Sequence, residues 1–241
     1  MLRRTRLQAR SETAPPSVLQ APKLQAIDFA VERVQARSVA DLGGVWAVEG
    51  GYVRYALERP GVERGVLVDT GITDPVRAAA AADPRLRLVA GEFGATSSVA
   101  AVGEVDVVLL FDVLLHQVAP DWDEVLRRYA QTSRCIVVVE PTWTGDEVVR
   151  LWDLGEDGYR AATPSDGAQP DWSRLDEVHP RYGRPHRDVH EYWQWGLPDA
   201  ARRKVMTDLG WRCVYWADHG PWRDVATART VASVYVAPGV D

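Results

Sequence analysis

The chain has 241 residues, 46% of them hydrophobic and 26% charged, which is ordinary for a globular protein able to bury a core. Its formal net charge of −6 argues against broad contact with nucleic acid, because that affinity rests on Lys and Arg side chains that neutralise phosphates. Two cysteines, Cys135 and Cys213, leave no disulfide framework, and no apolar run approaches the roughly 20 residues of a membrane span. We therefore expect a cytoplasmic protein that binds a small molecule, with a homodimer as the candidate assembly and no nucleic-acid or membrane partner.

The chain begins with a segment that lacks a regular pattern. Residues 1–18 are rich in Arg, Ser and Pro, and this composition predicts a flexible N-terminal arm. Apolar residues then recur at near-helical spacing through residues 19–37, among them Ile27, Val31 and Val34, which predicts a helix. Residues 19–241 are expected to form one domain.

Strand and helix signals alternate after this helix. Five apolar runs, each continuous in Val, Leu or Ile, predict parallel strands covered on both faces: residues 39–42, 66–69, 86–90, 105–111 and 135–140. Helical segments are expected between them at residues 51–57, 75–82, 98–102 and 121–131. This alternation predicts a doubly wound α/β core.

The regularity stops after Trp143. Residues 144–196 carry many Gly and Pro without a clean period, and they are too long for an idle connection, so we predict an inserted lid that binds an acceptor. A helix at 198–209 and strands at 211–217 and 230–237 follow, and the two strands predict a closing antiparallel pair. The expected fold is thus α/β, with a seven-stranded, mostly parallel sheet.

Two neighbouring strands end in acids. Asp41 closes the first apolar run just before Gly43 and Gly44, and Asp69 closes the second. At the carboxyl edge of a parallel sheet, such acids predict a pocket for an adenosine ligand, with Asp69 on the ribose hydroxyls. The Gly-x-Gly-x-x-Gly spacing that approaches a pyrophosphate is absent. A ligand without phosphate, whose cationic groups a carboxylate can meet, fits this pattern better.

Five segments in order resemble the class I S-adenosylmethionine-dependent methyltransferase family. They are residues 39–44, 66–69, 89–93 and 106–116 and the pair Glu140-Pro141. The resemblance covers about residues 35–143 and the C-terminal strand pair. The first motif departs from the family pattern, which usually has three closely spaced glycines.

The resemblance implies a Rossmann-like methyltransferase fold, S-adenosylmethionine as cofactor, and a set of cofactor-binding residues. It assigns the methionine end to Asp41, Gly43 and Gly44, the ribose to Asp69 and Thr70, the adenine to Glu92 and Phe93, and the tip of the fourth strand to Phe111, Asp112 and Val113. For Asp69 a turn-forming role competes with ribose binding, and for Glu92 a solvated loop position does.

Aromatic and imidazole side chains gather in the second half of the chain, since seven of ten tryptophans and four of five histidines follow residue 150. This bias suits a flat organic acceptor. The candidate acceptor-binding residues are Trp143, Tyr182, Tyr192 and Trp193, and the candidate bases are His116, His186 and His190. His186 and His190 are four residues apart, but no third ligand is identifiable by spacing, so no metal is expected.

The predicted function is methyl transfer to a small-molecule acceptor, at a hydroxyl of a natural product or other secondary metabolite. One alternative is a nicotinamide-dependent oxidoreductase, which the missing glycine spacing and the absence of a catalytic Tyr-x-x-x-Lys disfavour. Another is a non-catalytic Rossmann-like binding module, which has no need of acids at two strand ends.

Overall fold

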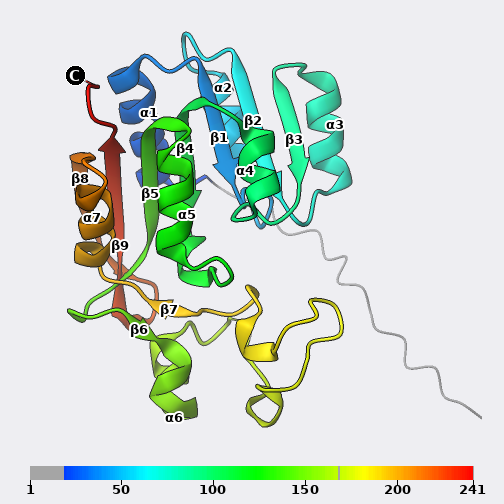
Figure 1. The fold of residues 1–241 in the computed structure, drawn as a ribbon, viewed down its shortest axis with the longest axis vertical. Coiled ribbons are helices and arrows are strands. Elements are labelled where there is room, and N and C mark those ends of the chain that lie inside the picture. The colour runs from blue at the N-terminus through cyan, green and yellow to red at the C-terminus, as the bar shows by residue number, and fades with distance from the viewer. Residues whose placement is uncertain (1–18, 168, 241) are drawn as a thin grey trace, which may run out of the picture.

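The computed structural model describes residues 19–167 and 169–240, so the arm predicted for residues 1–18 lies outside it. Its centre is one seven-stranded sheet in the order β3-β2-β1-β4-β5-β9-β8 (Figure 1). The strands are β1 (Ser38–Leu42), β2 (Arg64–Asp69), β3 (Leu86–Ala90), β4 (Val105–Phe111), β5 (Ser133–Trp143), β8 (Arg212–Trp222) and β9 (Val225–Val236). β1 to β5 run parallel, while β9 pairs antiparallel with both β5 and β8, which confirms the predicted sheet.

Helices cover both faces of the sheet. One face carries α1 (Ala21–Val34), α2 (Gly51–Leu57) and α3 (Asp74–Ala82), and the other carries α4 (Thr96–Val102), α5 (Trp122–Ala130) and α7 (Asp199–Asp208). Successive strand residues serve opposite faces, since the buried Val107 packs with the α1–α3 layer and the buried Val108 with the α4–α7 layer. The core is therefore doubly wound.

The closing hairpin is longer than the sequence predicted. β8 continues past residue 217 to Trp222, and β9 begins at Val225 rather than at residue 230. Register shifts interrupt the pairing between Asp218 and Trp222. Gly220, which has a left-handed φ, and Pro221 are residues typical of turns. The sequence pattern therefore predicted that the strand ends before them.

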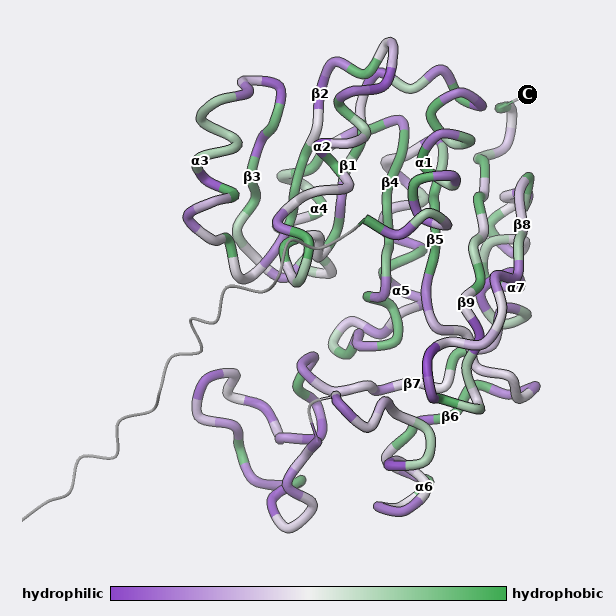
Figure 2. Tube along the Cα trace, turned by 180° about the vertical axis from the view of Figure 1, so that it is seen from behind, coloured by the Kyte–Doolittle hydropathy of each residue, from purple (hydrophilic) through white to green (hydrophobic). Residues whose placement is uncertain are grey.

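The predicted lid lies beyond the carboxyl ends of the parallel strands. In Figure 1 these ends are the arrowheads, and the lid is on that side of the sheet. Its elements are β6 (Val149–Arg150), α6 (Gly155–Ala162), β7 (Trp195–Gly196) and three short 3-10 helices, η2 (Leu151–Leu154), η3 (Trp172–Arg174) and η4 (His186–Asp188). A small hydrophobic cluster of its own, centred on Trp152 and Tyr159, holds the lid together. Figure 2 shows hydrophobic colours along the central strands and mainly hydrophilic colours along the lid loops.

None of the helices in the described ranges combines the length and the apolar character that crossing a bilayer requires.

Candidate functional site

A tight backbone turn follows β1 and packs against the residues that follow β4. Gly43 follows β1 with a φ of 75°, and a Cβ built there would lie 2.8 Å from Val113 Cγ1 and 3.4 Å from Phe93 Cε1. Both the left-handed conformation and the close approach require glycine. The structure thus brings together three of the predicted cofactor-binding residues, from three different strand ends.

Asp41 lies beneath this turn. Its side chain is fully buried, and neither carboxylate oxygen completes a hydrogen bond of good geometry among the described residues, although the amide of Val53 is near enough to favour the ionised form. A methyl group at Gly44 would overlap that carboxylate. Burial raises the pKa of Asp41 to about 7, and the amide of Val53 and the ammonium of Lys23 offset only part of this effect. A buried acid that lacks a hydrogen bond is costly unless a ligand or water donates one. The Asp41 carboxylate therefore fits a ligand with a cationic group.

Asp69, at the end of β2, holds two loops by their backbones. Its Oδ2 accepts from the amide of Val45 at 3.0 Å, and its Oδ1 accepts from the amide of Gly71 at 2.8 Å. Asp69 is therefore turn-forming, as the competing interpretation expected. A carboxylate offers about four acceptor positions, so two remain for ribose hydroxyls and its cofactor role stays a prediction. Thr70 follows with an exposed side chain.

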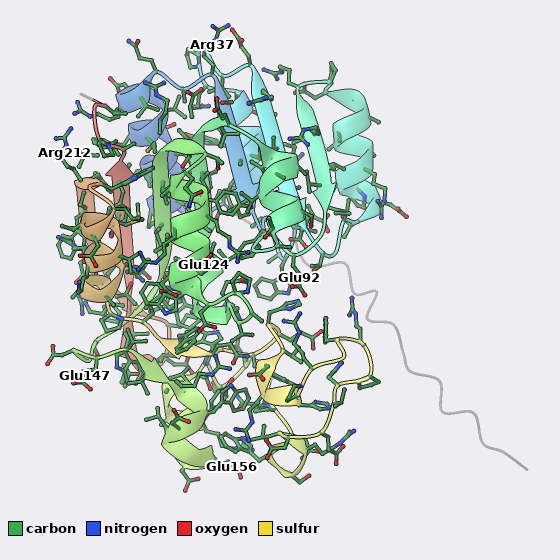
Figure 3. The ribbon with its side chains drawn as sticks, viewed as in Figure 1. Arg37, Glu92, Glu124, Glu147, Glu156 and Arg212 are labelled. Carbon is green, nitrogen blue, oxygen red and sulfur yellow. The ribbon has the colours of Figure 1, made fainter. Side chains whose placement is uncertain are left out.

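Glu92 is held by the lid. Its Oε1 accepts from Nη2 of Arg184 at 2.8 Å, which makes an ion pair between residues 92 positions apart. Figure 3 labels Glu92 at the boundary between the sheet edge and the lid. Its side chain stays 38% exposed on a loop, so it is a partly solvated acid with an ion-pair partner, and its adenine role stays a prediction; the long-range partner Arg184 gave no local signal.

Lys23 is a site residue that the sequence interpretation missed. It lies in the first turn of α1, is 4% exposed, and places Nζ 2.5 Å from Oδ2 of Asp112. Its ammonium is 5.3 Å from the ring centroid of Tyr52 and 5.6 Å from that of Phe111. The signal was available, since Lys23 occupies the same helical stripe as the buried Ala26 and Ile27.

His116 connects the tip of β4 with the lid. It ends the short helix η1 (Leu114–His116), and its Nδ1 is 2.8 Å from the carbonyl oxygen of Tyr192. Because a carbonyl only accepts, Nδ1 carries the proton and the neutral ring keeps its lone pair on Nε2. Burial lowers the pKa of His116, which favours this neutral form.

The two other candidate bases do not share a helical face. His186 begins η4, which ends at Asp188, so His190 lies beyond it in irregular chain. The His186 ring packs 4.6 Å from that of His179, while the His190 ring is 5.0 Å from that of Tyr182. Burial lowers the pKa of His190. Within residues 19–167 and 169–240, no group of three or more His, Cys, Asp or Glu could hold a metal ion.

Three of the four aromatic candidates pack into the lid itself. Trp143, Tyr192 and Trp193 lie against the small cluster around Trp152, and a Cβ at Gly196 would come within 2.8 Å of Trp143 Cδ2. Tyr182 is separate, and its hydroxyl donates to Oε1 of Glu191 at 2.5 Å. Their packing gives these tryptophans a structural role, whichever ligand the lid meets.

A cleft of about 590 Å³ opens between the lid and the loop that leads into α5. Its walls are Val118, Ala119, Asp121, Arg150, Trp152, Asp153, Arg184, Arg187, Asp188 and Trp195. Charges of both signs line it: Arg150 pairs with Asp188 at 2.8 Å, and its guanidinium lies 4.7 Å from the Trp195 ring centroid. Sequence reasoning missed this cleft, because its walls come from four separated segments.

No protein-family model matches the sequence, and no curated protein matches it either. Solved structures do match. The N-terminal domain of EvdMO1, crystallised in the presence of S-adenosylhomocysteine (SAH) and D-fucose, is 14% identical over 91% of this chain and 84% of that chain, with a TM-score of 0.58. A Burkholderia thailandensis 1,6-didemethyltoxoflavin-N1-methyltransferase with bound 1,6-didemethyltoxoflavin and SAH is 16% identical over 90% of this chain and 78% of that chain, with a TM-score of 0.57.

The mitomycin 7-O-methyltransferase MmcR is 17% identical, with a TM-score of 0.51, and the match covers 89% of this chain but only 53% of that one. These similarities establish the architecture. The chain has the Rossmann-like fold of class I S-adenosylmethionine-dependent methyltransferases, as the sequence motifs predicted.

Proposed function

We propose that the protein is an S-adenosylmethionine-dependent methyltransferase that methylates a small molecule, at a hydroxyl of a natural product. One observation carries the proposal: the fully buried Asp41 completes no hydrogen bond of good geometry within residues 19–167 and 169–240, directly under the glycine turn at the carboxyl edge of a methyltransferase-type sheet. A structural acid at this position would need a donor. A binding module without a ligand has no reason to keep it.

The residues present give each part of the cofactor a place. Asp41, Gly43 and Gly44 would hold the methionine end, Asp69 and Thr70 the ribose, and Glu92 and Phe93 the adenine, with Phe111, Asp112 and Val113 at the tip of β4. When bound, the cofactor supplies a methyl group already activated by its sulfonium. The task left to the chain is alignment of the acceptor and exclusion of water, which can account for much of the acceleration.

The lid, residues 144–196, is the proposed acceptor-binding element. The open cleft beside it has the size of a small-molecule site, but its walls include none of the candidate bases or acceptor-binding residues, so the cleft and the proposed acceptor residues are separate parts of the lid region. EvdMO1 and the toxoflavin methyltransferase, which share the fold, were crystallised with D-fucose and 1,6-didemethyltoxoflavin. His116 is the preferred base among the three candidates, because the contact of its Nδ1 with the Tyr192 carbonyl oxygen orients the ring and its lowered pKa keeps it neutral, the form that can take up a hydroxyl proton. Tyr182 and the lid aromatics would then shape the acceptor site.

The test compares two ligands. SAH at 100 times its dissociation constant should stabilise the protein by about 2.7 kcal/mol, seen as a rise in melting temperature, whereas NAD should have no effect. A shift with NAD alone would favour the oxidoreductase. With neither ligand active, the proposal fails. The acceptor is then sought by incubating the protein with labelled cofactor and small-molecule extracts, and identifying the compound that gains one CH2.

Two further expectations stay predictions. The cytoplasmic location rests on the low cysteine content, and fractionation of cells tests it. The homodimer is tested by light scattering of the purified protein.

A further inference from the structure

The chain contains two lysines, Lys23 and Lys204, and they lie in opposite environments. The side chain of Lys204 is 74% exposed, whereas that of Lys23 is 5% exposed. Burying an ammonium is costly unless strong partners compensate, and an apolar residue of similar size often serves stability as well or better. The neighbours of Lys23 on the α1 stripe, Ala26, Ile27 and Ala30, are all apolar. Packing alone therefore does not explain a lysine here.

The position of the Lys23 ammonium is informative. It lies at the carboxyl edge of the sheet, beside Asp112, the residue that directly follows β4. Asp112 adopts a left-handed φ of 55°, which is uncommon for a residue other than glycine and which turns the chain at the strand tip. Its side chain is 35% exposed, so the ion pair opens toward the site on the Asp112 side.

The ammonium also has unused hydrogen-bonding capacity. It carries three N–H donors, and Asp112 is its one hydrogen-bond acceptor among the described residues. The rings of Tyr52 and Phe111 lie at cation–π distance and contribute no acceptor oxygen to it. The buried Asp41 is close enough for the Lys23 charge to lower its pKa. One cation and two acids thus converge at the same end of the site.

We propose that Lys23 binds the carboxylate of the amino-acid end of the cofactor and that Asp112 binds its ammonium. This inference rests on the proposed function. A free amino-acid end is a zwitterion, and recognising it takes an anion and a cation side by side, which the Lys23–Asp112 pair presents. Before binding, the charges of Lys23 and Asp112 compensate each other. On binding, the ligand carboxylate becomes a partner of Lys23 and the ligand ammonium a partner of Asp112.

The test uses two ligands that differ only in this end. SAH carries the amino-acid group, and 5′-methylthioadenosine has the same nucleoside and thioether sulfur without it. By calorimetry, Lys23→Met should weaken SAH binding about 10- to 100-fold, the worth of a charge-assisted hydrogen bond, and change methylthioadenosine binding less than about twofold. Lys204→Met, the matched control at the exposed lysine, should change neither.

Asp112→Asn provides a second variant. The Asp112 side chain is partly exposed, so the fold should tolerate the loss of its charge more easily than the loss of the Lys23 charge. The Asp112→Asn variant should also weaken SAH more than methylthioadenosine. Equal losses for both ligands, or SAH affinity retained in either variant, would overturn the inference and leave a purely structural ion pair. Absence of SAH binding by the unmodified protein is a different result, since it removes the proposed function itself.

Discussion

The sheet edge and the lid present their side chains by different means. At the sheet edge, Asp41 and Asp69 belong to strands β1 and β2, and the hydrogen-bonded register of these strands fixes the position of each residue. The lid is placed by single contacts between distant segments, such as Arg184 with Glu92 and His116 with Tyr192. The sheet edge is therefore preorganised, while the lid can shift by exchanging a few polar partners. This division suits a constant ligand at the edge and a variable one under the lid.

Gly44→Ala should produce the largest effect, because it attacks the preorganised side. The added methyl would overlap the carboxylate of the fully buried Asp41, so that side chain or the loop must shift. We expect a loss of about 2–3 kcal/mol in unfolding free energy. SAH affinity should fall about 100-fold, measured by calorimetry.

Gly103→Ala is the control for that variant. Gly103, unlike Gly44, has a left-handed φ of 69°; it precedes β4 at the opposite edge, and a Cβ there meets nothing within 4 Å. It should lower the melting temperature through backbone strain alone and leave SAH binding intact. Equal SAH losses in the two variants would show that the Asp41–Gly44 packing is not specific to the site.

Asp41→Asn should give a smaller, pH-dependent effect. Because burial raises the pKa of Asp41 from 3.8 to about 7, the folded state holds a proton that the unfolded state releases. The resulting stabilisation is complete below about pH 4 and is lost as the pH rises through 7. Relative to the asparagine variant, the ligand-free protein should lose about 2 kcal/mol between pH 5 and 8. Denaturant unfolding across that range measures it, and a constant difference between the two proteins contradicts the assignment.

Arg184→Gln should have the smallest effect, on the lid side. The pair with Glu92 is partly exposed, so its loss should cost less than about 1 kcal/mol of stability. If Glu92 binds the adenine amino group, releasing it should tighten SAH binding about two- to fivefold, whereas Glu92→Gln should weaken it. Arg181→Gln, which removes an exposed lid arginine near Glu191, is the control. Weaker SAH binding in Arg184→Gln would mean that the ion pair supports the site instead of competing with it.

Sequence periodicity predicted the regions where local physics decides the structure. Apolar runs placed β1 to β5 and their acidic ends, because a strand buried on both faces has a distinct composition. Periodicity could not predict the contact of Arg184 with Glu92, because the two residues are 92 positions apart and belong to no shared helix or strand pattern. Lys23 lies between these cases: its place on the apolar stripe of α1 was visible, but its partner Asp112 belongs to another strand end.

The contact between His116 and the lid has a consequence for how such a protein diversifies. His116 reaches the main chain at position 192, and Gln194 likewise donates its backbone amide to the carbonyl of Leu115. Neither tether depends on a lid side chain. Exchanging Tyr192 or Trp193 therefore leaves both backbone tethers to η1 in place and acts on the packing around Trp152, so the lid can be reshaped from within while its attachment to the sheet edge is kept.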